Sequence, residues 1–172
     1  MKSFEGLQEF LLIGVDPQTE WYPIPNGEND QDHAINGLKK TAKELQCFLK
    51  SLQEKYEFCP EQTALVGFSA GAVIALELAL HAAEEYKMVI SHNGAIFANK
   101  EIPQADKKTN FVLLHTQDDA CFTWTERYVP MKNALCQKGY NVISIEHPIG
   151  GHKVFDEDII TMGTYLKNKF VD

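Results

Sequence analysis

The segment Gly67-Phe68-Ser69-Ala70-Gly71 places a serine between two glycines with GxSxG spacing. It follows the apolar run 63–68 and precedes an alanine- and leucine-rich stretch, which predicts a strand-to-helix turn at Ser69. Such a turn strains the serine backbone, and the start of the helix directs N–H groups toward charge that develops beside it. The pattern favours Ser69 as a nucleophile; the alternative is a tight turn in which Ser69 only caps the helix.

A nucleophilic serine needs a base, and the base needs a carboxylate that orients it. Asp118 and Asp119 follow one apolar run of the sequence, and His152 follows the next. Both positions come directly after predicted strands, where α/β proteins place their reactive loops. Two glycines before His152 allow its loop to fold back toward Ser69. This reasoning favours His152 as the base and leaves both aspartates open as the carboxylate.

The remaining histidines offer weaker alternatives for the base. His147 lies close to the predicted site and is the main competitor. His92 and His115 end predicted strands, where a ring often satisfies loop backbone groups, and His33 and His81 lie on predicted helices and are expected at the surface. There is no HExxH motif and no cluster of ligand residues, so we expect no metal and no other cofactor.

The cysteines are expected to be free thiols. They show neither a CxxC pair nor zinc-like spacing with histidine, and they are Cys47, Cys59, Cys121 and Cys136. Cys121 is close enough to line the site, although a packed, small apolar side chain is the simpler expectation. Residues 1–5 lack the apolar core of a secretion signal, so the cytoplasm is the expected compartment.

Short apolar runs alternate with helical segments along the 172 residues. Strands are expected at 63–68, 87–91, 110–115 and 141–146, and Phe10–Val15 is either a further strand or part of a helical segment over 2–12. Helices are expected from Asp30 or Asp32 to about Tyr56, and at about 71–85, 124–138 and 156–170, with a long loop at 16–30. This order predicts one α/β domain over residues 1–172, a mostly parallel sheet of about five strands with helices on both faces.

The charge balance and the length of the apolar runs argue against nucleic acid and membrane insertion. Sixteen Lys and Arg face 24 Asp and Glu, a net charge of −8, and no basic cluster stands out. An acidic surface repels phosphate backbones, so nucleic acid is not an expected partner. No apolar run approaches the roughly 20 residues that span a bilayer, so no membrane insertion is expected.

Four segments carry a recognisable set of motifs, and they are Trp21-Tyr22, Leu65–Ala72, Leu114–Asp119 and Gly151-His152. Together they resemble the phospholipase/carboxylesterase family, bacterial relatives of the acyl-protein thioesterases within the α/β-hydrolases. In chain order they are similar to the family's WF segment, its GFSQGG elbow, the stretch read HGxxD that ends in the acid, and the final Gly-His. The resemblance runs from about residue 5 to the end, and it selects Asp119 as the acid.

The sequence also departs from this family. Thr116 stands where the family has glycine, and Ala70 stands where glutamine is common. The family carries an earlier strand and a His-Gly loop ahead of the region that matches residues 1–15, and this loop normally gives one oxyanion N–H. Ala70 N–H remains as one donor, and the second has no evident source. A missing strand would also expose a sheet edge, which predicts pairing with a second copy in a homodimer.

The resemblance implies a serine hydrolase that cleaves esters or thioesters with short to medium acyl groups. Ser69 would attack the carbonyl, His152 would carry the proton, and Asp119 would hold the imidazole. The expected pocket walls are Trp21, Phe122, Ile149 and Trp124, although such side chains pack in cores more often.

Other functions remain as alternatives. The first is a hydrolase-like remnant that acts as a binding or interaction module because its oxyanion loop is missing. A hydrolase of dienelactone type would need a cysteine nucleophile where this chain has Ser69. A doubly wound nucleotide-binding protein would need GxGxxG or GxxxxGK[ST], which this elbow lacks.

Overall fold

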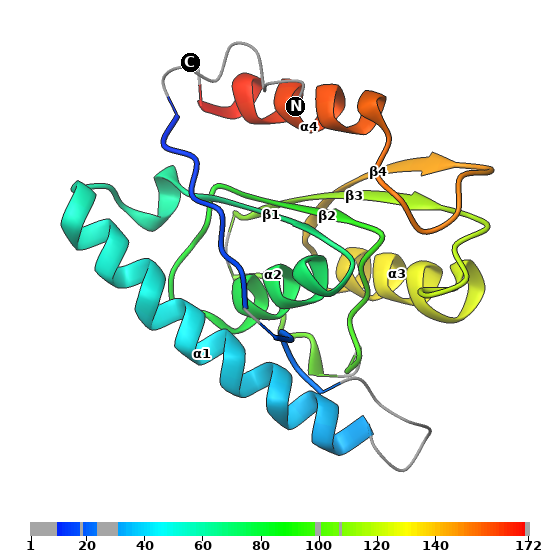
Figure 1. Ribbon diagram of the computed structural model, residues 1–172, viewed down its shortest axis with the longest axis horizontal. Helices are drawn as coiled ribbons and strands as arrows, with labels where there is room; N and C mark the ends of the chain where they lie inside the picture. Colours follow the sequence, from blue (N-terminus) through cyan, green and yellow to red (C-terminus); the bar gives the residue numbers. More distant parts are fainter. Residues whose placement is uncertain (1–9, 18, 24–30, 99–100, 107, 171–172) are drawn as a thin grey trace.

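The computed structural model describes residues 10–17, 19–23, 31–98, 101–106 and 108–170 (Figure 1). Three sequence predictions lie wholly or partly outside the described residues: the helical segment before residue 10, the predicted loop at residues 18 and 24–30, and the helix cap at Asp30.

The described residues form one sheet of four parallel strands in the order β1-β2-β3-β4. The strands are β1 (Ala64–Phe68), β2 (Met88–His92), β3 (Asn110–Thr116) and β4 (Asn141–His147). Each lies within about a residue of a predicted strand, which confirms the parallel α/β prediction. Because the strands are parallel, their carboxyl ends all meet at one edge, where Ser69 follows β1 and the loops to Asp119 and His152 follow β3 and β4.

The expected fifth strand does not form. Residues 10–15 have no strand pairing, although the chain there is rich in apolar side chains. Phe10 packs edge-on against Phe170 at the end of the last helix, with 5.4 Å between the ring centroids. Tyr22 belongs to the core on the opposite face of the sheet. The segment therefore crosses the β1 edge from one face to the other instead of running along it (Figure 1).

Helices cover both faces of the sheet (Figure 1). On one face lie α1 (Gln31–Tyr56), α2 (Ala70–His81) and α3 (Val129–Gln137), and on the other lies α4 (Asp156–Phe170). The central strands serve both cores: Val89 and Phe111 contact the first helix layer, and Ile90 and Val112 face α4. This two-sided burial explains why β2 and β3 are continuous apolar runs.

Two helices differ from their predicted bounds. The helix α2 ends at His81 and not near Glu85. The helix expected from Trp124 begins as a π-helical turn, Trp124–Tyr128, and continues as α3. Pro130 stands at this junction and has no N–H to donate to a carbonyl four residues back, so a regular α-helical pattern cannot pass through it. Among the described residues, no helix combines the length and the apolar character needed to cross a membrane.

Candidate active site

The turn after β1 presents Ser69 at the carboxyl edge of the sheet. Ser69 has φ 55° and ψ −122°, a backbone conformation that residues other than glycine rarely adopt. A Cβ at Gly67 would collide with the carbonyl of Gly71 and lie 2.5 Å from the amide of Ala72, so this position requires glycine. The backbone N–H of Ser69 donates to the carbonyl of His92 at 3.0 Å, which ties the turn to the end of β2.

The ring of His152 lies between Ser69 and Asp119. Its Nε2 is 2.8 Å from the Ser69 Oγ, and its Nδ1 is 2.8 Å from the Asp119 Oδ2. A carboxylate only accepts hydrogen bonds, so Nδ1 carries the proton and Nε2 is the acceptor for the serine hydroxyl. The three residues that the sequence analysis selected therefore lie in one hydrogen-bonded chain.

Asp119 is fixed in place by its own loop. Its side chain is fully buried, and its Oδ1 accepts the backbone N–H groups of Cys121 at 2.7 Å and Phe122 at 3.0 Å. With Oδ1 occupied in this way, Oδ2 points to the imidazole of His152. A carboxylate held in this position can keep the ring in one tautomer and stabilise its protonated form.

Asp118, the other candidate acid, has a different set of partners. Its Oδ1 accepts the backbone N–H groups of Gly150 at 2.8 Å and Gly151 at 2.7 Å. These hydrogen bonds, with that from Gly151 the stronger influence, hold the pKa of Asp118 below its usual value. Asp118 thus binds the backbone of the loop that carries His152.

Two polar side chains that the sequence analysis did not select hold the same loop from below. The carbonyl of Gly151 accepts hydrogen bonds from Thr116 Oγ1 at 2.5 Å and from Asn93 Nδ2 at 3.1 Å. Asn93, with φ 46°, also accepts the backbone N–H of Thr116 at 3.2 Å. Thr116 replaces a glycine of the resembled family, and this departure was the one signal that pointed to it.

A third aspartate binds the start of the loop. Asp158, at the first turn of α4, lies between His92 Nε2 at 2.8 Å and His147 Nε2 at 2.7 Å. It also accepts the N–H of Phe155 at 3.0 Å. Burial favours a higher pKa for Asp158, but the hydrogen bonds from His92, Phe155 and His147 outweigh it and lower the pKa. Nothing in the sequence motifs indicated Asp158.

These contacts account for the competing histidines. His147, the main alternative base, faces Asp158 and not Ser69. His92 was expected to bind loop backbone and instead binds Asp158, while its Nδ1 is buried without a partner. His115 does bind backbone, through Nε2 to the carbonyl of Phe122 at 2.8 Å. His33 and His81 are exposed, as expected.

Only one oxyanion donor can be assigned among the described residues. Ala70 is the first residue of α2, so its N–H has no acceptor within the helix and is available beside Ser69. It also lies at the positive end of the helix dipole.

The predicted pocket walls differ in their position. The ring of Phe122 lies 5.9 Å from that of His152, and Trp21 lies near Gly71, close to the elbow. Ile149 is 79% exposed in the loop before His152. Trp124 is partly buried against the core and stacks on Tyr128. Phe68, which the sequence analysis did not select, lies 5.0 Å from the His152 ring.

Among the described residues, one carboxylate, one thiol and one imidazole form a group of potential metal ligands. Asp119, Cys121 and His152 place ligand atoms within 4.8 Å of one another. However, Asp119 and His152 hydrogen-bond directly at 2.8 Å, whereas two ligands of one zinc ion stand roughly 3.3 Å apart.

All four cysteines are free and exposed, so the expectation that Cys121 is packed was wrong. Its N–H binds Asp119, and its exposed thiol lies within 4.8 Å of the ligand atoms of Asp119 and His152.

Residues 12–166 match the family model described as phospholipase/carboxylesterase. The chain belongs to this family. The match confirms the resemblance found from the motifs, and it covers the elbow, both aspartates of the β3 loop and His152. The assignment supports a carboxylesterase-type hydrolase.

Solved structures show the same fold at low sequence identity. Esterase PE8 is 24% identical, with a TM-score of 0.76 over 87% of this chain and 70% of that protein. SOBER1 from Arabidopsis thaliana is 18% identical, with a TM-score of 0.72 over 87% of this chain and 73% of that one. The carboxylesterase of Bacillus cereus is 19% identical, with a TM-score of 0.71 over 80% and 64% of the two chains.

Proposed function

We propose that this protein is a serine hydrolase that cleaves carboxylic esters or thioesters through an acyl-serine intermediate, without a cofactor. The observation that carries the proposal is the hydrogen-bonded chain from Ser69 Oγ through the His152 ring to Asp119, with both links at 2.8 Å. Membership of the phospholipase/carboxylesterase family supports the same reaction class.

Each residue of this hydrogen-bonded triad acts at defined steps of the reaction. Ser69 Oγ attacks the carbonyl carbon while its proton passes to His152 Nε2, and Asp119 stabilises the imidazolium that forms. The N–H of Ala70 binds the oxyanion. The tetrahedral intermediate collapses, His152 returns the proton to the leaving alcohol or thiol, and the acyl group stays on Ser69. Water, deprotonated by His152, then attacks the acyl-serine and releases the acid.

The preferred substrates are short to medium acyl esters, with Phe122, Trp21 and Ile149 as walls of the acyl site. Phe122 is the best placed of the three because its ring lies beside that of His152. With one assigned oxyanion donor we expect slow turnover, since the loss of a donor costs about 10²–10³ in kcat.

A fluorophosphonate probe tests the proposal because it reacts with activated serines. We expect it to label the protein at Ser69, and Ser69→Ala to abolish both the labelling and the hydrolysis of p-nitrophenyl acetate. Ser51→Ala, which changes an exposed serine on α1, is the matched control and should behave as wild type. Unchanged hydrolysis by the Ser69→Ala variant would refute the mechanism.

A binding module without catalysis is the second candidate, favoured by the single oxyanion donor. It predicts that the wild-type protein is neither labelled nor active, while an unreactive analogue of an ester, such as the corresponding ether, still binds. Labelling that is lost on Ser69→Ala would exclude this candidate.

Three further properties belong to the proposal. The chain forms a single domain, since helices of both layers pack on one sheet. It works in the cytoplasm, where its exposed, unpaired thiols would stay reduced. Its partners are a small ester substrate and a second copy of the chain, and nucleic acid is not among them because the net charge is −8.

A further inference from the structure

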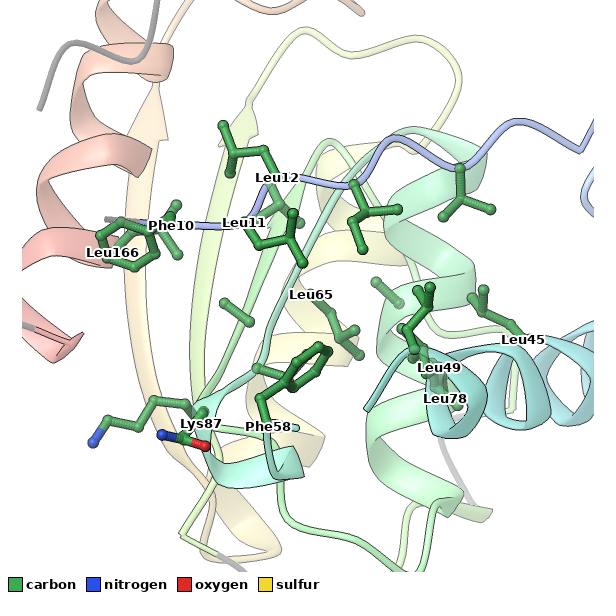
Figure 2. A pocket seen from close by; sticks show the side chains of 18 of the residues that line it. Phe10, Leu11, Leu12, Leu45, Leu49, Phe58, Leu65, Leu78, Lys87 and Leu166 are labelled. Carbon is green, nitrogen blue, oxygen red and sulfur yellow. The ribbon is translucent and has the colours of Figure 1, made fainter. Parts of the chain in front are cut away.

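An apolar groove runs along the open side of β1. It has a volume of 820 Å³ and lies among residues 10–15, β1, one side of α1 and the end of α4 (Figure 2). We call it the edge groove, and we call residues 10–15 the strap. Figure 2 shows Leu11 and Leu12 on the strap above Leu65 of β1, with Leu49 of α1 on one side and Leu166 of α4 on the other.

The exposed apolar side chains of the protein gather at this groove. Ten large hydrophobic side chains are exposed among the described residues, and six of them line it: Leu11, Leu12, Ile13, Val15, Tyr56 and Val66. Leu11 and Leu12 are more than half exposed, at 57% and 59%. A contiguous patch of this kind marks an interaction site, whereas single exposed apolar residues do not.

The backbone of β1 at the groove can also form further hydrogen bonds. Within the described residues, β1 pairs with β2 on one side and with no strand on the other. An open parallel edge presents N–H and C=O groups that a polypeptide can bind. An acyl chain would fill the apolar space but leave these groups without partners, so the edge favours a protein occupant.

Charge bears on whether that protein can be a second copy of this chain. The whole chain carries −8, so two copies repel each other over most of their surface. Among the described residues, the charged side chains that line the groove are Glu61, Lys87 and Lys169, a local balance of +1. Two copies can therefore approach at this face with less like-charge repulsion than the net charge implies.

We propose that the edge groove is the interface with a second copy of this chain. Each chain carries both halves of a self-complementary contact, namely apolar groove walls at Leu65 and Val66 and largely exposed strap side chains at Leu11 and Leu12. In a two-fold dimer the strap of each copy enters the groove of the other, because a residue pair in such an interface occurs twice. The inference goes beyond the hydrolase activity and does not depend on it.

Sedimentation velocity between about 1 and 100 μM tests the interface, at a salt concentration near 0.15 M, where surface charges are screened. The expected result is a concentration-dependent shift from the 19.4 kDa monomer to a species of twice that mass. Leu12→Lys and Val66→Lys place a charge in the groove and should each leave the protein monomeric at the highest concentration.

Ile160→Lys is the matched control. Ile160 is 68% exposed on α4 and does not line the groove, so the variant adds the same charge elsewhere and should still dimerise. Far-ultraviolet circular dichroism and the melting temperature check that each variant is folded. Leu12→Lys changes a largely exposed side chain and keeps the test valid where the strand variant fails to fold.

Three outcomes would overturn the inference. They are a wild-type protein that stays monomeric at 100 μM, a dimer that persists in both groove variants, and a dimer that Ile160→Lys disrupts equally. A monomer whose groove binds dansyl-undecanoate, with the binding lost in Val66→Lys, would assign the groove to an acyl chain instead. None of these results bears on labelling of Ser69, so the two proposals fail separately.

Discussion

Asp118 and Asp119 are neighbours in the chain and bind two different parts of the same loop. Asp118 accepts the backbone N–H groups of Gly150 and Gly151, and Asp119 accepts the ring Nδ1–H of His152. One carboxylate is exposed and holds the turn, while the other is buried and holds the ring. The loop after β3 therefore fixes both the path of the base loop and the orientation of its imidazole.

This division of roles predicts unequal effects of the same substitution. Asp119→Asn should lower kcat for p-nitrophenyl acetate by about 10³–10⁴, because an amide favours the wrong tautomer of His152. Asp118→Asn keeps an oxygen that accepts from the turn and should cost less than about tenfold. Steady-state kinetics on both variants make the comparison, and a larger loss in Asp118→Asn would mean that the acid is misassigned.

The contact of His147 with Asp158 predicts an effect on the base loop. His147→Ala removes a donor to Asp158 just before the loop that carries His152. The imidazole of His152 should therefore lose its alignment with Ser69. We expect fluorophosphonate labelling to slow by about tenfold, because displacements of an ångström cost up to 10² in rate. His147→Gln retains an N–H donor and should restore most of the rate. A lower melting temperature with unchanged labelling in His147→Ala would assign the contact to stability alone.

The tight turn before Ser69 predicts opposite outcomes for its two glycines. Gly67→Ala pushes a methyl group into the backbone of Gly71 and should destabilise the fold by more than about 2 kcal/mol or prevent soluble expression. Gly71→Ala meets only Trp21 Nε1, at 3.9 Å, and should be neutral or stabilising by up to about 1 kcal/mol, since alanine is the better helix former. Urea unfolding of both variants gives the comparison; equal losses would contradict the turn geometry.

Two buried histidines predict how stability depends on pH. Burial lowers the pKa of His92 and of His115 in the fold and outweighs the hydrogen bonds that raise it. In the unfolded chain histidine titrates near about 6.5, so below that pH the unfolded state binds more protons than the folded state. The stability that these groups contribute is complete above about pH 6.5 and is lost as the pH falls toward the lowered values.

Urea unfolding between pH 7.5 and 5.5 measures this loss, which approaches about 1.4 kcal/mol per pH unit for each proton taken up. His115→Gln keeps a donor for the Phe122 carbonyl but does not titrate, so its stability should fall less steeply with pH. His33→Gln changes an exposed ring and should retain the wild-type slope. Parallel slopes for wild type and His115→Gln would contradict the prediction.

The sequence predicted strands best where both faces of a strand are buried. The strands β2 and β3 were predictable because both of their faces are covered, which leaves continuous apolar runs. The same signal misled at Phe10–Val15, where an apolar run crosses the open edge of β1 from one face of the sheet to the other and forms no strand pairing along it. Apolar composition alone does not distinguish these cases, because strand formation depends on a partner that lies elsewhere in the chain.

The sequence by itself determined the elbow at Ser69, since strand, turn and helix follow one another within a few residues and the close backbone approach requires glycine at 67. It also determined that Asp118, Asp119 and His152 follow strands of one parallel sheet, which brings their loops to one edge. The motif resemblance had already selected Asp119 as the acid. Only the tertiary structure decided that Asp118 binds the turn, and that Thr116, Asn93 and Asp158 hold the loop. These contacts depend on side-chain directions across segments that are distant in the chain, and residue spacing carries no information on those directions.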